Sequence, residues 1–573
     1  MTDQNNAVIR IQLPAGAKIA VVWIMLAAIV GAGAWIGIKG LYAYPEAMHS
    51  IAAHLRLASV LLLPAMALIA FVAAADKGAE LTVGASAFFA RHAGATLAIL
   101  TVVVGLAILA GVAALAAFPN SGDEYSYLYQ AQTFLAGRLW NALPPVPDFF
   151  TTEHILQQDG KWVSQYPPGW ALIIAAVVRL GVPAWIASPL TAICLLLVFA
   201  RLAYEVGGWY TSLLGTALLG ISAFFVLNGA SYFSHVPTAL FGTVFVLFAL
   251  RFIDCAETGA ALAAGAGLGM AGLIRPLSAV LVALPFAVEF LLRARWSDYR
   301  KALWIAVGGA PFLVATCWYN YRIDGNPFLP VISWGFPLLK MGLHPVNEYG
   351  DVRNLIETSQ MAVDRLIELA EWTSPLLLAL YAAALVTKIA RRGVRFYDFI
   401  FPVFVVGYLF YPDIGGNRYG PRYYFEAYPF LALTVASAAA PYLRGENRSG
   451  AATALVGAAI GAHLTVAAIT CFPWAHQFHR IVAERMALYD LVKERRLDNA
   501  VVVIRSTVGP TKSMSAADLT RNGIALDGGV LFAQDEGIEG RDQELFRAFP
   551  DRDFYVFARP PEGGEPTLLP MTR

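Results

Sequence analysis

The stretch GATLAILTVVVGLAILAGVAALAAF (residues 94–118) decides the fold class, and PNSGDEYSYLYQ (119–130) follows it directly. The first stretch carries no charged residue and is longer than the roughly 20 apolar residues that a helix needs to cross a bilayer. The second stretch brings two adjacent acids, Asp123 and Glu124. The junction therefore predicts a transmembrane helix that ends at one membrane surface and delivers two carboxylates there.

The composition of the whole chain supports the membrane class. Of the 573 residues, 58% are hydrophobic and only 14% are charged, whereas soluble domains carry roughly 25% charged residues. The net charge of +1 gives no reason to expect nucleic acid as a partner. The four cysteines stand singly in apolar segments, so their spacing indicates neither a zinc site nor a disulfide framework.

Similar apolar runs recur along the chain and predict an all-α polytopic membrane protein of about thirteen transmembrane helices. We expect these helices near residues 19–38, 55–75, 94–118, 184–204, 209–227, 235–254, 260–276, 277–293, 303–319, 372–389, 398–412, 428–443 and 452–472. The pair 260–276 and 277–293 is joined by Arg275-Pro276, which is either a tight corner or a kink in one helix.

Basic residues in short loops predict the orientation, because Lys and Arg collect on the cytoplasmic side. They cluster at 293–301, 388–395 and 444–448. Loops 119–168, 320–371 and 413–427 then lie outside. The run 169–182 supplies only about 21 Å of helix at 1.5 Å per residue, so we expect a half-helix or interfacial helix on the outer side.

The predicted domain organisation has three parts. Residues 1–93 hold N-terminal transmembrane helices, 94–472 form a transmembrane core with the three outer loops, and 473–573 form a small extracytoplasmic α/β domain. In the last part, 482–496 reads as a polar helix, and 499–505, 529–534 and 553–559 read as short strands between turn residues.

The acidic pair after the first helix has a structural and a catalytic interpretation. Ser121 and Glu124 fit a capping box, in which the Glu side chain returns to the N-cap amide. This interpretation accounts for Glu124 and leaves Asp123 as a candidate general base at the membrane surface.

Three further positions on the outer side carry candidate functional residues. Tyr166 stands before Pro167-Pro168 and fits an interfacial aromatic belt. His235 begins an apolar run, where it is either a hydrogen-bonded helix-end residue or a ligand or base. Arg275 lies between two apolar runs, and an Arg at such depth is costly unless it is paired or lines a cavity.

The segment DIGGNRYGPRYYFE (413–426) is the strongest local signal in the sequence. Its two arginines, Arg418 and Arg422, face outside, where the positive-inside rule disfavours them. Paired guanidinium groups suit bidentate binding of phosphate. The alternative is an Arg–Glu network that pins the loop.

These motifs together resemble the GT-C superfamily of polytopic glycosyltransferases, especially the branch of protein O-mannosyltransferases and the transferase that adds aminoarabinose to lipid A. The resemblance covers about residues 94–443 and rests on GDEYSY (122–127), SQYPPGW (164–170), FSHVPTALF (233–241), GLIRP (272–276) and NRYGPRYYFEAYPF (417–430). The helices before residue 94 and the C-terminal region lie outside it, which leaves the acceptor open.

The resemblance implies a membrane glycosyltransferase of the bacterial inner membrane, with its active site facing the periplasm or cell exterior. The donor is then a sugar on polyprenyl phosphate, and the acceptor a glycan, lipid or protein hydroxyl. In the family the acid of the first outer loop is the base, or holds the acceptor and sometimes a metal, so a divalent cation stays open. That role falls on Asp123, with Glu124 as neighbour or substitute.

The same resemblance assigns the remaining site residues. Arg275, Arg418 and Arg422 are expected to bind the donor phosphate, and Tyr166, His235, Tyr423 and Glu426 to line the substrate site. A transporter or flippase of a lipid-linked sugar is the alternative. It would place charges near the middle of the bilayer, whereas here they stand at helix ends.

Overall fold

The computed structural model describes residues 76–293, 296–332, 355–411, 416, 418–447, 449–505, 515–535, 540–559 and 565–572. The chain divides into two units, Met1–Ala70 and Phe71–Arg573, and all described residues belong to the second. The predicted helices 19–38 and 55–75 therefore lie outside the described residues.

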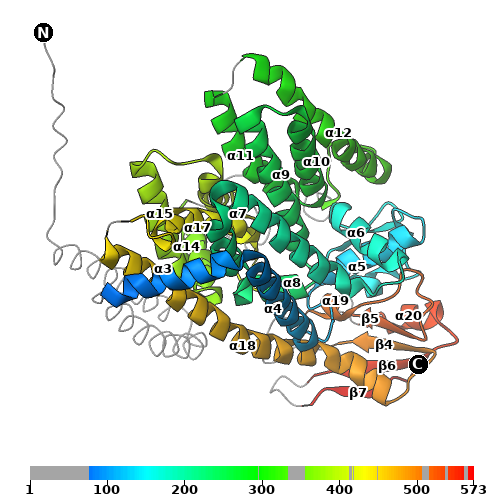
Figure 1. The fold of residues 1–573 in the computed structure, drawn as a ribbon. Coiled ribbons are helices and arrows are strands. Elements are labelled where there is room, and N and C mark those ends of the chain that lie inside the picture. Colours follow the sequence, from blue (N-terminus) through cyan, green and yellow to red (C-terminus); the bar gives the residue numbers. More distant parts are fainter. Residues whose placement is uncertain are drawn as a thin grey trace, which may run out of the picture. The chain divides into compact units, whose positions relative to one another are not determined.

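Most of the second unit is a bundle of helices (Figure 1). Its helices are α3 (Asp76–Arg91), α4 (Ala93–Ala114), α7 (Ala187–Gly220), α8 (Ala223–Ala230), α9 (His235–Cys255), α10 (Thr258–Ile274), α11 (Pro276–Arg293), α12 (Trp296–Asp324), α14 (Leu355–Trp372), α15 (Pro375–Ala390), α16 (Ile400–Gly407), α17 (Tyr428–Leu443) and α18 (Gly450–Glu494). Short 3-10 helices η2 (Ala184–Ile186), η3 (Phe396–Phe399) and η4 (Arg422–Ala427) lie between them.

Six helices of the described part are long and apolar enough to cross a membrane, or seven if the pair α14–α15, bent by 111°, is counted as one span. The protein is thus a multi-pass membrane protein, and the predicted number of thirteen spans is not confirmed. Several predicted spans correspond to helices of 17 residues or fewer, such as α10, α15 and α17. Such helices are short for the hydrocarbon core.

The α7 segment contains a sharp break that makes it a helical hairpin. Gly207 and Gly208 have non-helical backbone angles, and Gly208 has a φ of 72°, which glycine adopts without steric cost. Ser212 Oγ donates to the carbonyl oxygen of Ala200 at 2.8 Å, although twelve residues of straight helix would separate them by about 18 Å. The two arms therefore pack against each other, as the predicted runs 184–204 and 209–227 require.

Arg275 is the corner between α10 and α11. Its backbone is extended, with φ −144° and ψ 91°, and Pro276 begins the next helix, a position that proline favours. Of the two predicted alternatives, the structure has a corner and two separate helices.

The first loop (residues 119–168) has more structure than the sequence predicted. After α5 (Gly122–Leu135) come β1 (Asn141–Ala142), η1 (Pro147–Phe150), β2 (Ile155–Gln158) and β3 (Lys161–Ser164). The three strands form an antiparallel sheet in the order β1-β3-β2. The loop then leads into α6 (Gly169–Arg179), the short helix that the run 169–182 predicted.

The predicted loop 320–371 is partly helical. α12 extends to Asp324, and α14 occupies the last part of the loop from Leu355 onward. The sequence LIETSQMAVDRLIELAEW of α14 alternates apolar and charged residues with helical spacing, so its helical character was readable but was missed.

The C-terminal region is continuous with the bundle. α18 runs for 45 residues through the predicted boundary at 473 and contains much of the expected polar helix 482–496. The predicted strands appear as β4 (Ala500–Ile504), β5 (Val530–Gln534) and β6 (Asp553–Ala558), and β7 (Thr567–Pro570) was missed. Short helices α19 (Ala516–Leu519) and α20 (Asp542–Ala548) accompany them.

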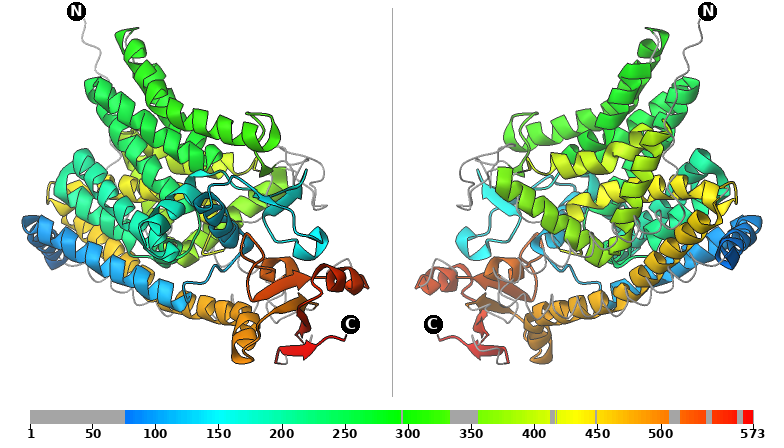
Figure 2. Two further views of the ribbon diagram at one scale, coloured as in Figure 1. Left: turned by 90° about the vertical axis from the view of Figure 1, so that its right-hand side faces the viewer. Right: turned by 90° about the vertical axis from the view of Figure 1, so that its left-hand side faces the viewer.

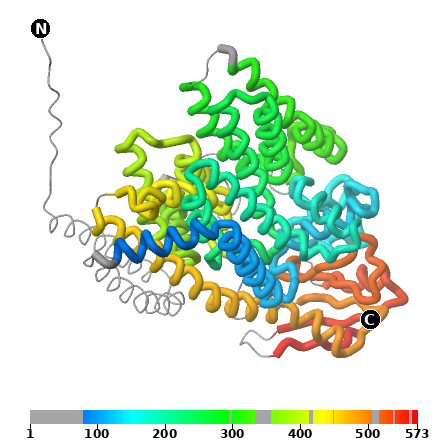
Figure 3. Tube along the Cα trace, in the orientation of Figure 1, coloured from blue at the N-terminus to red at the C-terminus, as the bar shows by residue number. Residues whose placement is uncertain are grey.

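These strands form one sheet in the order β5-β4-β6-β7, parallel except for the last pair. Figure 2 shows the sheet beside the first loop, and Figure 3 shows α18 running from the bundle to it. Trp162 and Phe149 of the first loop share one hydrophobic core with Val501, Leu531 and Phe554 of the sheet. The C-terminal region is therefore packed against the first loop, and an independently folded α/β domain is not confirmed.

Candidate active site

Asp123 lies in the first turn of α5, where three side chains surround its carboxylate. Ser121 caps the helix by accepting a hydrogen bond from the amide of Glu124 at 3.2 Å. Tyr166 donates its hydroxyl to Asp123 Oδ1. His154 Nε2 and an Arg422 nitrogen stand 3.7 Å and 3.5 Å from Oδ2. The Asp123 side chain keeps 17% of its surface exposed.

The charges around Asp123 keep it ionised. Burial raises the pKa of this carboxyl, but the positive charge of Arg422, together with His154 and the Tyr166 hydroxyl, holds the pKa well below its usual range. The positive end of the α5 dipole acts in the same direction. Asp123 is therefore a carboxylate at neutral pH and accepts hydrogen bonds.

Glu124, the adjacent acid, has a different environment. Its side chain is fully buried, and its oxygens accept from the amide of Tyr232 at 2.9 Å and the hydroxyl of Tyr419 at 3.4 Å. Burial raises its pKa to about 7. Ser121 is the cap that the sequence predicted, but the Glu124 carboxylate reaches across to Tyr232 on another segment. Its role in the structure is to tie the first turn of α5 to the chain before α9.

A third carboxylate, Glu426, lies in η4 with Arg422 and Tyr423. Its Oε1 is 3.1 Å from His235 Nδ1 and 3.0 Å from Arg275 Nε, and it accepts from Ser278 Oγ at 3.2 Å. The structure thus brings together His235, Arg275 and Glu426, which are far apart in sequence. Tyr127 of α5 and Arg275 both bond to Ser234 Oγ, at 2.8 Å and 3.3 Å, so this cluster is joined to the helix that carries Asp123.

Three guanidinium groups surround the ring of Tyr423. The Cζ atoms of Arg275, Arg365 and Arg422 lie 5.8, 5.1 and 5.8 Å from its centroid. Cations at this range are attracted to an aromatic face. Arg275 also pairs with Glu426 and Arg422 with Asp123, so a phosphate placed here would join a network that already contains carboxylates.

Arg418 occupies a different place from the other predicted phosphate ligands. It donates to the carbonyl oxygen of Asn120, directly before the turn that carries Asp123. This contact with a backbone carbonyl favours the alternative interpretation of segment 413–426, in which an arginine fixes the loop.

Solved structures with a similar fold identify the architecture. ArnT from Cupriavidus metallidurans bound to undecaprenyl phosphate aligns over 81% of this chain and 93% of its own, with 12% identity and a TM-score of 0.50. Its apo form aligns over the same shares with 14% identity and a TM-score of 0.49. The Archaeoglobus fulgidus oligosaccharyltransferase aligns over 80% and 69%, with 10% identity and a TM-score of 0.45.

The chain has the GT-C fold. No family model and no curated protein matches the sequence significantly. At 12% identity the first of these likenesses concerns the fold alone, so the site must be argued from this chain's own residues.

Two residues of the site in this GT-C chain escaped the sequence analysis. His154 lies in the first loop between η1 and β2, with a φ of 62° and its Nδ1 2.9 Å from Gln165 Nε2. Arg365 lies in α14, 4% exposed. The helical spacing of α14 could have pointed to Arg365 as one of the few basic residues on a predicted outer segment, whereas nothing around His154 in the sequence singles it out.

Among the described residues, no group of three or more His, Cys, Asp or Glu side chains is arranged to hold a metal ion. The binding of a divalent cation therefore stays a prediction from the sequence. The described part of the site consists of one partly exposed carboxylate, Asp123, two buried carboxylates, Glu124 and Glu426, and an arginine cluster.

Proposed function

We propose that the protein is a membrane glycosyltransferase that moves a sugar from a polyprenyl-phosphate donor to an acceptor hydroxyl. The observation that carries the proposal is the position of Asp123, an accessible carboxylate whose neighbour Arg422 also belongs to the arginine cluster around Tyr423. A group that accepts a proton and a group that binds phosphate are thereby a few ångströms apart.

A cavity beside Arg275 supports a lipid-linked donor. It measures about 440 Å³ and lies between α10, α11 and α12, with Leu273 and Pro276 among its apolar lining residues. These two residues flank Arg275 closely in sequence. An isoprenoid chain in this groove would bring its phosphate toward the Arg275 side of the cluster. The GT-C neighbour ArnT was crystallised with undecaprenyl phosphate, which fits the same donor class.

The proposed reaction is a single displacement. The acceptor oxygen attacks the anomeric carbon while the bond from that carbon to the phosphate oxygen breaks, which inverts the configuration. The Asp123 carboxylate orients the acceptor hydroxyl and takes its proton late, when the oxygen has become acidic. The arginines around Tyr423 stabilise the negative charge that develops on the leaving phosphate as its bond to the sugar breaks.

The location of the charged residues favours this function over transport. His235, Arg275 and Arg422 stand at the first residue of α9, the corner before α11 and the start of η4. A transporter would place its binding site near the middle of the bilayer. We further propose that this end of the bundle faces the periplasm or cell exterior of a bacterial inner membrane, with a glycan, lipid or protein as acceptor.

Asp123→Asn tests the proposal with purified protein and a panel of polyprenyl-phosphate sugars. At least one donor should raise the thermal unfolding temperature of the wild type and support transfer. The variant should keep this donor protection but lose at least about a hundredfold in transfer rate, because an amide cannot accept the proton.

Asp159→Asn is the matched control, since Asp159 is exposed in the same loop with a φ of 50° that Asn also tolerates. It should transfer at the wild-type rate. Retained transfer in Asp123→Asn would remove Asp123 as the base, and the absence of protection by every donor would contradict the donor class.

A further inference from the structure

The segment Ser515–Asn522, which we call the strap, connects β4 to β5 and contains α19. It contacts the first loop on both sides of Asp123, although it lies almost four hundred residues away in sequence. The proposed reaction assigns no role to it, and the C-terminal region had none in the sequence analysis.

On one side the strap holds the chain that enters α5. Arg521 Nη1 donates to the carbonyl oxygen of Pro119, and the Tyr125 hydroxyl donates to the carbonyl oxygen of Asn522. The Arg521 guanidinium also lies 5.4 Å from the centre of the Tyr125 ring. The turn from 120 to 124 is thus fixed at both its ends.

On the other side the strap holds residues 152–154. Thr152 Oγ1 donates to the carbonyl oxygen of Thr520 at 2.8 Å, the amide of Glu153 donates to that of Ala517 at 3.3 Å, and Ser515 Oγ donates to the Glu153 carboxylate. A Cβ atom on Gly122 would lie only 2.4 Å from Glu153 Cβ. Glu153 is therefore confined between the strap and the residue that precedes Asp123.

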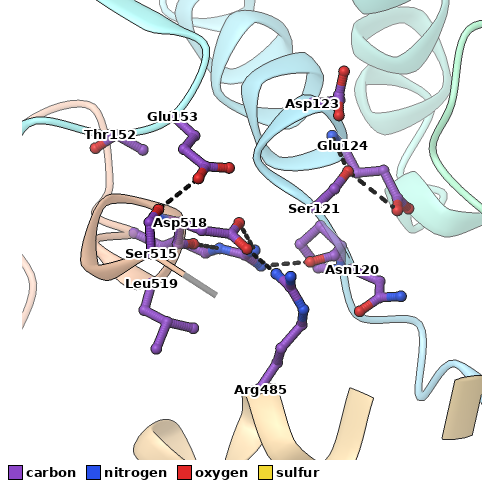
Figure 4. Close-up of polar contacts among 12 residues, drawn as sticks. Asn120, Ser121, Asp123, Glu124, Thr152, Glu153, Arg485, Ser515, Asp518 and Leu519 are labelled. Atoms are coloured by element: carbon purple, nitrogen blue, oxygen red, sulfur yellow. Dashed lines mark hydrogen bonds and ion pairs between the residues drawn. The ribbon is translucent and has the colours of Figure 1, made fainter. Parts of the chain in front are cut away.

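A buried ion cluster fixes the strap to α18. Asp518 pairs with Arg485 of α18 and, at 2.9 Å, with Arg521, and all three side chains are at most 5% exposed. Figure 4 shows Asp518 to the left of the chain that carries Asn120 and Ser121, with Arg485 reaching up toward it from α18 below. Tyr489 of α18 adds a hydrogen bond to the carbonyl oxygen of Leu519 at 2.8 Å.

Burying three charges is costly, and well-packed apolar residues in their place often give equal or greater stability. A role in fixing geometry would account for this cluster. Here Arg521 serves both sides of the arrangement, pairing with Asp518 and bonding to Pro119. A change at Asp518 therefore reaches the turn before Asp123 through a single side chain.

We propose that the strap is a positioning element of the active site, in which Asp518 orients Arg485 and Arg521 and thereby sets the place of the Asp123 carboxylate. The catalytic consequence rests on the proposed function. The structural consequence, a fixed turn at 119–125, does not.

Hydrogen exchange of the full-length protein tests the structural part with Asp518→Asn. The variant should lose at least about tenfold in protection at the amides of 120–125 and 152–154, because local opening of this turn becomes easier. Asp535→Asn is the matched control, because Asp535 directly follows β5 and is a buried carboxylate that pairs with Arg505 at 2.6 Å. Equal exchange at these amides in the two variants would overturn the proposal.

Steady-state kinetics test the catalytic part with the same variants, corrected for the folded fraction. Asp518→Asn should lower kcat at least tenfold and leave the KM for the donor within about twofold, since small misplacement of a catalytic group is costly to rate. Asp518→Glu should restore part of kcat, whereas Asp535→Asn should keep it. A donor KM that rises with kcat unchanged would contradict a positioning role.

The two measurements separate the two proposals. If the wild type transfers no sugar but Asp518→Asn still loses protection at 120–125, the proposed function fails and the strap remains the holder of the turn. If the wild type transfers sugar and Asp518→Asn changes neither exchange nor kcat, the proposed function stands and the positioning role is wrong.

Discussion

Ion pairs occur at both ends of helices α9 and α11. We call the end with Asp254 and Glu289 the far end and the end with His235 and Arg275 the site end. At the far end, Lys388 pairs with Asp398 at 2.6 Å, and Arg395 pairs with Glu289 at 2.8 Å and Asp254 at 2.9 Å. Each cation there has a carboxylate. At the site end, Arg275 pairs with Glu426 at 3.0 Å and Arg422 with Asp123 at 3.5 Å. These two arginines and Arg365 also share the ring of Tyr423.

The two ends differ in what surrounds their charged groups. At the far end Asp398 also accepts from Thr434 Oγ1 at 2.9 Å and from the amide of Arg395 at 2.8 Å, so its hydrogen bonds are made within the protein. At the site end three guanidinium groups are gathered around one aromatic ring, and the Asp123 side chain is 17% exposed. The second arrangement concentrates three cations in one place, which is the reason we propose a phosphate site there.

Removing a charge from the far end should have the largest effect on stability. Asp398→Asn should lower the free energy of unfolding by about 3 kcal/mol, because it leaves the buried Lys388 without its charged partner. Chemical unfolding in detergent would measure this, with Lys388→Met plus Asp398→Leu expected to recover most of the loss. Transfer per folded molecule should not change, and a lower rate would show that this network also serves the reaction.

Glu124 is a structural carboxylate inside the site end, and its titration should destabilise the fold. Its folded-state pKa of about 7 exceeds its ordinary value of 4.5. Between these values the unfolded chain releases the proton and the folded chain keeps it, so stability falls as pH rises through this window, by at most about 3 kcal/mol, and is level above it.

Glu124→Gln removes this titration and should reduce the decline in stability between pH 5 and 7.5, as thermal unfolding at several pH values would show. If the variant and the wild type had the same slope, the buried Glu124 carboxyl would not be the group that titrates.

Substitutions of the site-end arginines should have the smallest effect on the free energy of unfolding and a specific effect on donor binding. Arg422→Lys should raise the donor KM about tenfold, because an ammonium cannot match the planar, bidentate geometry that suits phosphate. Arg418→Lys should change it little, since Lys can also donate to the Asn120 carbonyl. Equal effects of the two substitutions would restore the predicted role of Arg418 as a phosphate ligand.

Much of the fold was predictable because it follows from local sequence patterns. The apolar run at 94–118 gives α4, Ser121 gives the cap of α5, the short run at 169–182 gives α6, and three of the four C-terminal strands follow from β-prone runs. The predicted number of thirteen spans is not confirmed, because several apolar runs form helices that are short or broken, such as α10 and α7, and two lie outside the described residues.

The sequence by itself determined the membrane class, the candidate acid Asp123 and the residue types that suit phosphate. Only the tertiary structure decided which of these residues meet. It separated Asp123 from Glu124 by environment, placed Arg418 on a backbone carbonyl, and added His154, Arg365 and the strap. The physical reason is range: helix caps and apolar runs act within a few residues, whereas the contacts of Asp123 and Asp518 join segments that are tens to hundreds of residues apart.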